Sequence, residues 1–230
     1  MRYFIDCEFD ENGKTIELIS IGITCEDGRD YYAISTEFNP KKCSQWVKDN
    51  VLNTLPPRFV DPVHGSPRLR EEAQAWKSRD RIAIEVLAFL KKWPVPVNYQ
   101  ERSWFDKLWY KRQPLQDSSD LQVRNLWSYR PNNPIEVWSE WGSYDWVTLC
   151  QLFGTMMDLP RGFPMRIRDI IQLAEDELGI PSHQLPPSLE TEGNHNALLG
   201  AKTVQMRYDW LIKQKNEVLC GSSNESAPSS

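Results

Sequence analysis

The feature that most constrains this chain is a pair of carboxylates directly after an apolar segment near the N-terminus. Tyr3-Phe4-Ile5 predicts a short buried strand, and Asp6 and Glu8 follow it at alternate positions. Because residues i and i+2 of a strand point to the same face, both carboxylates project together while Cys7 points away. Carboxylates at such a place are costly unless cations neutralise them. The pattern fits a metal site and an ordinary polar strand end equally well.

Apolar periodicity predicts that the following residues alternate between strands and helices. Ile16–Thr24 has strand alternation, Asp27-Gly28 predicts a turn, and Tyr31–Ser35 predicts the returning strand of a three-stranded meander. Further predicted elements are a strand at Ile135–Trp138 and helices at Cys43–Leu52, from the cap Ser78 to Pro94, and at Ser143–Phe153, Ile167–Leu178 and Ala197–Lys215. Together they predict a single α/β domain with a mixed sheet and helices on both faces.

The predicted domain occupies residues 1–216 of the 230-residue chain. Its segment 94–134 is rich in proline and mostly without a clean period, which predicts an irregular insertion. Residues 217–230 include a Ser-rich run, which predicts a disordered tail.

Composition excludes several classes of protein. No apolar run is long enough to span a membrane, and Asp6 leaves no room for a signal peptide at the start. The five cysteines are scattered without a C-x-x-C pair, which favours free thiols in a cytoplasmic protein. A net charge of −5 is unlike that of a passive nucleic-acid coat protein, but it does not exclude a nuclease, because clustered carboxylates that hold cations contribute to such a charge.

Two further polar elements stand at predicted helix starts. Asp145 falls in the first turn of its helix, just after a predicted strand, where a carboxylate is also a routine finding. His195 precedes the last long helix, in Asn194-His195-Asn196-Ala197, and a lone histidine is more often structural than catalytic. Each element alone is weak support for a site.

Taken together, these elements resemble the DEDDh branch of the 3′-5′ exonuclease superfamily, which has the ribonuclease-H-like fold. The family motifs are D-x-E on the first strand, an aspartate opening the helix after the fourth strand, and H-x-A-x-x-D. The matching residues here are Asp6, Glu8, Asp145, His195 and Ala197. Longer stretches over most of residues 1–55 and 135–210 are similar to mycobacterial 3′-5′ exoribonucleases.

The resemblance implies an exoribonuclease that removes nucleoside 5′-monophosphates from the 3′ end of single-stranded RNA, adenylate-rich ends in particular. Asp6, Glu8 and Asp145 would hold two Mg²⁺ or Mn²⁺ ions, for which oxygen ligands are suited. His195 would act as the general base, because an imidazole titrates near neutral pH. A homodimer is likewise implied by the resemblance.

One position departs from the family pattern. The third motif should end with an aspartate, and that position is Gly200, although nothing in the neighbouring sequence calls for a glycine. Asp209 is too far along the helix to replace it, Glu192 would help only if its loop folds back, and Asn196 is a weak ligand. A water is a further replacement.

Three interpretations of the glycine stay open. They are a weak natural enzyme, a natural pseudo-nuclease that binds RNA ends or adenylate, and a substitution introduced to trap substrate. A structural protein with an idle motif is a further rival.

Aromatic residues offer candidate RNA contacts. Trp138 and Trp141 flank the second motif and are predicted walls of a nucleic-acid pocket, although packing alone would also explain them. Trp104–Arg112 interleaves aromatic and basic residues, as a single-strand groove requires. Core packing of an amphipathic helix is the favoured interpretation there.

Overall fold

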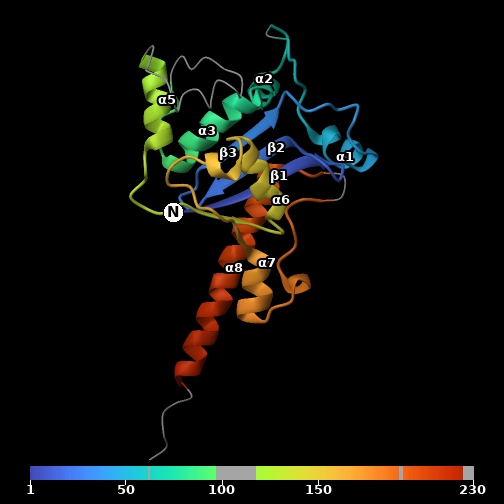
Figure 1. Cartoon of the computed structure of the whole chain (residues 1–230). Coiled ribbons are helices and arrows are strands. Elements are labelled where there is room, and N and C mark those ends of the chain that lie inside the picture. The colour runs from blue at the N-terminus through green and yellow to red at the C-terminus, as the bar shows by residue number, and fades with distance from the viewer. Residues whose placement is uncertain (62, 97–117, 192–193, 225–230) are drawn as a thin grey trace, which may run out of the picture.

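A computed structural model describes residues 1–61, 63–96, 118–191 and 194–224, and it contains a six-stranded mixed sheet (Figure 1). The strands are β1 (Arg2–Glu11), β2 (Ile16–Cys25), β3 (Asp30–Ser35), β4 (Trp76–Lys77), β5 (Glu136–Ser139) and β6 (Arg168–Asp169). Their order in the sheet is β4-β3-β2-β1-β5-β6. The first three form the predicted antiparallel meander, and β5 joins β1 in parallel. This is the mixed α/β architecture of a ribonuclease-H-like fold.

Helical segments stand at each of the five predicted places, and two further helices, at Pro67–Ala73 and Ser118–Ser128, were not predicted. They are α1 (Gln45–Asn50), α2 (Pro67–Ala73), α3 (Arg79–Lys91), α5 (Ser118–Ser128), α6 (Ser143–Gln151), α7 (Ile170–Gln172) and α8 (Ala197–Asn224), with short turns η1 (Leu52–Thr54), η2 (Met156–Asp158), η3 (Leu173–Glu177) and η4 (Ser182–Gln184). Ser78 caps α3 as predicted, since its hydroxyl accepts a hydrogen bond from the Arg81 N–H at 3.1 Å. None of the helices in the described ranges is long and apolar enough to cross a membrane.

Two predicted boundaries need correction. The segment expected to be irregular contains α5, and α8 continues to Asn224, past the predicted helix end at Lys215 and the tail start at 217. Local composition suggested a tail because the serines in this stretch have only modest helix propensity. The predicted aromatic and basic stretch Trp104–Arg112 lies outside the described residues, as does 225–230.

Side-chain alternation along β1 divides the core into two layers. Tyr3, Ile5 and Cys7 pack with α3, α5 and α6 on one face of the sheet, whereas Phe4 packs with α7 and α8 on the other. Figure 1 shows α3 and α5 on one side of the sheet and α7 and α8 on the opposite side. Asp6 and Glu8, which share the face of Phe4, are therefore directed toward α8.

A glycine in the centre of the sheet lets α8 begin close to these carboxylates. A Cβ atom added at Gly22 of β2 would overlap the backbone of Ala197 and Leu198, the first two residues of α8. The first turn of α8 consequently lies directly against β2, next to β1. This contact brings the residues around the start of α8 to the carboxylates of β1.

Candidate active site

The β1 carboxylates lie on the face predicted from strand periodicity. Cys7 packs in the opposite core layer, while Glu8 is only 9% exposed on the α8 side. The pairing of β1 with β2 shifts register between Glu8 and Phe9, which is a bulge beside the site. Bulges of this kind re-aim side chains and are frequent next to active sites.

Asp145 joins these carboxylates from the first turn of α6. Its Oδ1 accepts a hydrogen bond from the Cys7 N–H at 2.9 Å, and its Oδ2 accepts one from the Ser139 hydroxyl at 2.8 Å. The side chain is buried, and burial raises its pKa to about 6. Asp145 is therefore fastened to β1 and β5 and is not a solvated first-turn acid.

His195 is held in place by the α1–η1 segment. Its backbone N–H donates to the carbonyl oxygen of Asn50 at 3.0 Å, and its own carbonyl accepts from the Thr54 hydroxyl at 3.1 Å. The imidazole is half-buried, and its centre lies 5.1 Å from the centre of the Trp46 ring. Two segments that are far apart in the sequence thus fix the position of this histidine.

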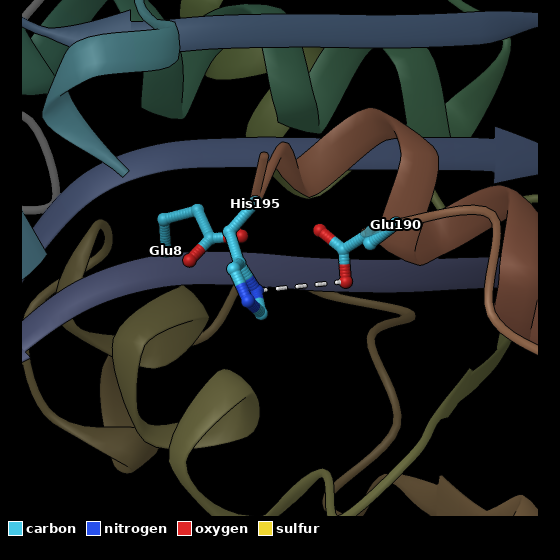
Figure 2. A group of neighbouring side chains, drawn as sticks. All are labelled: Glu8, Glu190 and His195. Carbon is cyan, nitrogen blue, oxygen red and sulfur yellow. Dashed lines mark ion pairs between the residues drawn. The ribbon is translucent and has the colours of Figure 1, made fainter. Parts of the chain in front are cut away.

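Glu190 is a member of the site that the sequence reasoning missed. Ligand atoms of Glu8, Glu190 and His195 all lie within 4.8 Å of one another, and Figure 2 shows the three side chains converging. Oε2 of Glu190 is 3.9 Å from Nδ1 of His195. Glu190 belongs to no motif, and Glu192, a candidate replacement carboxylate from the sequence, lies outside the described residues. Only the shortage of a carboxylate near His195 could have drawn attention to it.

Gly200 has a local reason that the neighbouring sequence does not reveal. A Cβ atom added at this position would overlap the Asp6 carboxylate, with Cγ of Asp6 2.5 Å away and its Cβ 3.0 Å away. This contact comes from a strand far away in the sequence, so the residues next to Gly200 give no sign of it. Asp6 fills the space that a side chain at position 200 would need.

A cavity of about 390 Å³ opens over these groups. Its lining includes Asp6, Glu190, His195, Gly200, Glu140, Trp141 and Arg207. The positive charge of Arg207 in this lining is paired with the carboxylate of Glu140. Of the two β1 carboxylates, Asp6 therefore faces this cavity, which is large enough for part of a nucleotide.

The two predicted aromatic walls have different surroundings. Trp138 is 7% exposed and packs against Phe4 and Tyr208, with 4.7 Å between its ring centre and that of Tyr208. This packing favours the alternative interpretation of Trp138 as a core residue, which shares the layer of Phe4. Trp141 is 66% exposed, lines the cavity and has a positive φ of 54°, which is unusual for a bulky residue.

The negatively charged forms of the site's carboxylates are unfavourable in their surroundings. Burial raises the pKa of Asp6 well above its ordinary value and that of Glu8 to about 8, and neighbouring carboxylates add to both effects. In the described part of the chain, no lysine or arginine forms an ion pair with Asp6, Glu8 or Asp145. The donor set is thus oxygen-rich and lacks a positive partner of its own, which fits a hard divalent ion.

In this ribonuclease-H-like fold, β1, the helix α6 that follows β5, and the loop before α8 bring carboxylates and a histidine together, as in a nuclease-type site. No family model matches the sequence. Two proteins from Mycobacterium tuberculosis do, the 3′-5′ exoribonuclease Rv2179c of strain H37Rv and the 3′-5′ exoribonuclease MT2234.1 of strain CDC 1551. Each is 36% identical over 208 residues, which cover 90% of this chain and 91% of the relative. The chain belongs to this 3′-5′ exoribonuclease family.

Proposed function

We propose that this protein is a divalent-metal-dependent exoribonuclease that releases nucleoside 5′-monophosphates from the 3′ end of single-stranded RNA. Its family supports the exoribonuclease activity. The observation that carries the metal dependence is that the charge of Asp6 is opposed by two buried neighbouring carboxylates, Glu8 and Asp145, and that none of the three has a basic partner among the described residues. Neighbouring carboxylates in a desolvated place are expensive unless cations bind them.

The proposed ions, Mg²⁺ or Mn²⁺, would be held by Asp6, Glu8 and Asp145. Although both oxygens of Asp145 accept hydrogen bonds, each carboxylate oxygen has a second lone pair for a ligand. When bound, two such ions stabilise the charge that develops on the attacking and leaving oxygens of a phosphodiester.

His195 is the proposed general base. Its Nδ1 faces Glu190, which leaves Nε2 to accept a proton from the attacking water. The water oxygen forms the new bond to phosphorus, and the bond from phosphorus to the 3′ oxygen of the preceding nucleotide breaks. That 3′ oxygen is protonated, and the products are a nucleoside 5′-monophosphate and an RNA shortened by one nucleotide.

Trp141 is the proposed stacking surface for a base of the RNA. Its indole is largely exposed at the cavity, and its left-handed backbone is a conformation that bulky residues seldom adopt without a functional reason. Aromatic faces bind bases with little sequence preference. A preference for adenylate and a homodimer stay predictions of the family resemblance.

A second candidate function is an RNA-end or adenylate-binding module without turnover. The observation that favours it is Gly200, which removes a carboxylate from the family motif. In that case the cavity would still bind an RNA 3′ end.

The test is hydrolysis of a 5′-labelled single-stranded oligoadenylate in Mn²⁺, with Asp6→Ala prepared identically as the control for contaminating nucleases. We expect stepwise shortening from the 3′ end, and a loss of about 100-fold or more in Asp6→Ala. Two further substrates are a matched RNA blocked by a 3′ phosphate and a DNA of the same sequence. A binding assay in Ca²⁺ measures RNA binding separately from cleavage. RNA binding without cleavage would select the binding module, and neither binding nor cleavage would refute both functions.

A further inference from the structure

A carboxylate from outside the family motifs reaches the site where the third motif lacks one. Position 200 is a glycine, so α8 supplies no carboxylate next to Asp6. Glu190 approaches instead from the loop that precedes α8, and it lines the same cavity as Asp6 and Gly200.

Hydrogen bonds hold Glu190 in this position. The Asn196 N–H, at the start of α8, donates to Oε1 of Glu190 at 2.7 Å, and the Glu190 N–H donates to the Ser188 hydroxyl at 3.0 Å. The Thr203 hydroxyl of α8 accepts from the Leu189 N–H at 3.0 Å and lies 3.3 Å from the Ser188 hydroxyl. The loop is thereby fastened to the helix. Oε2 of Glu190 accepts none of these hydrogen bonds and lies near Nδ1 of His195, in the lining of the cavity.

Glu8 gives an independent indication that a ligand belongs between these groups. Its carboxylate is about nine-tenths buried and, within the described residues, accepts no hydrogen bond and forms no ion pair. It is directed toward Glu190, and the ligand atoms of the two residues lie within 4.8 Å (Figure 2). Two desolvated carboxylates facing each other require a proton or a cation between them.

We propose that Glu190 is a metal ligand that replaces the aspartate absent at position 200, and that it binds a divalent ion together with Glu8. This inference rests on the proposed metal-dependent function. Carboxylate oxygens from a strand and from a tethered loop give the hard donor set that Mg²⁺ and Mn²⁺ prefer. The chain thus retains four carboxylates around the site, with one of them supplied by a different segment.

A different role for Glu190 is to orient His195, since its Oε2 lies 3.9 Å from Nδ1 of that ring. In this case Glu190 would be a positioning residue. Removing its charge would then change the pH profile of hydrolysis and would leave metal affinity unchanged.

The experiment is a titration of the RNA-free protein with Mn²⁺, followed by the electron paramagnetic resonance signal of the free ion. The variants are Glu190→Gln, Glu8→Gln and the control Glu140→Gln, which removes the same charge from the same cavity where it is already paired with Arg207. We expect one Mn²⁺ site to weaken by about tenfold or more in Glu190→Gln and in Glu8→Gln, and by clearly less in Glu140→Gln.

Folding is checked separately, by thermal unfolding in EDTA. Glutamine retains the oxygen that accepts from Asn196, so Glu190→Gln should melt no lower than the parent protein. Parent-like Mn²⁺ binding by Glu190→Gln, or an equal loss in Glu140→Gln, would overturn the inference. If the parent protein and all variants fail to bind Mn²⁺, the metal-dependent function itself is refuted.

Discussion

At the residue scale, the site depends on the close approach of α8 to β1. Asp6 lies against the backbone of Gly200, and its carboxylate takes up the space that a side chain at position 200 would need. Glycine has a low helix propensity, but it leaves room for the Asp6 side chain.

The substitution Gly200→Ala tests this contact. Alanine normally favours a helix over glycine by about 1 kcal/mol, but here its Cβ must displace the Asp6 carboxylate. We expect RNA hydrolysis to slow by about tenfold or more, which corresponds to about 1.4 kcal/mol, without a gain in the free energy of unfolding. Initial rates and urea unfolding measure both, and Lys213→Ala on the exposed part of α8 is the control. A fully active and more stable Gly200→Ala protein would contradict this account.

At the element scale, α5 is joined to α3 by a buried cation. The Lys91 ammonium group donates to the carbonyl oxygens of Leu126, Trp127 and Tyr129 at 2.8, 3.0 and 2.7 Å. These carbonyls belong to the last turn of α5 and the residues just after it, where a helix has unsatisfied acceptors and a partial negative charge. Burial lowers the pKa of Lys91 to about 8.

Replacing this lysine by a side chain of similar length should detach the two helices. In Lys91→Met the three carbonyl oxygens lose their donor, and we expect the free energy of unfolding to fall by about 2–3 kcal/mol. Urea unfolding monitored by circular dichroism measures the loss, and Lys213→Met is the matched surface control. The hydrolysis rate of the folded protein should change little, because α5 packs on the face of the sheet opposite the site. An unchanged unfolding midpoint would show that these hydrogen bonds contribute no net stability.

At the scale of the whole molecule, the fold brings several negatively charged side chains together in one region. β1, α6 and the loop before α8 each bring a carboxylate into a shared, largely buried volume, with few positive groups to offset it. Folding therefore works against electrostatic repulsion among these carboxylates, and the proposed metal ions would couple their binding to folding.

This coupling predicts how stability depends on pH. Burial raises the pKa of Glu8 from 4.5 to about 8 and that of Asp145 from 3.8 to about 6. At a pH between the lower and the higher pKa of each residue, the folded protein therefore binds more protons than the unfolded chain. The free energy of unfolding in EDTA should therefore fall as the pH rises from 5 to 8. Mn²⁺ should lessen the fall, and Glu8→Gln should remove a large part of it. Stability that increases over this range in EDTA would contradict the prediction.

The sequence by itself determined the features that depend on local periodicity and capping. The alternation in β1 placed Asp6 and Glu8 on one face and Cys7 on the other, because strand geometry has a period of two whatever surrounds it. The Ser78 cap and the position of Asp145 at a helix start are equally local. The meander and the main helices could be predicted in this way, whereas the choice of Asp6, Glu8 and Asp145 as site residues also needed the family resemblance.

Tertiary structure alone decided which distant residues meet. Glu190 joins the site because the loop before α8 is fastened to that helix, and a side chain at position 200 would have to displace Asp6 of β1, which packs against Gly200. Trp138 is buried because α8 covers its face of the sheet, and the two-residue strand β6 is too short to have a period of its own. These contacts depend on how segments far apart in the chain pack against each other, and no local pattern of residues encodes that packing.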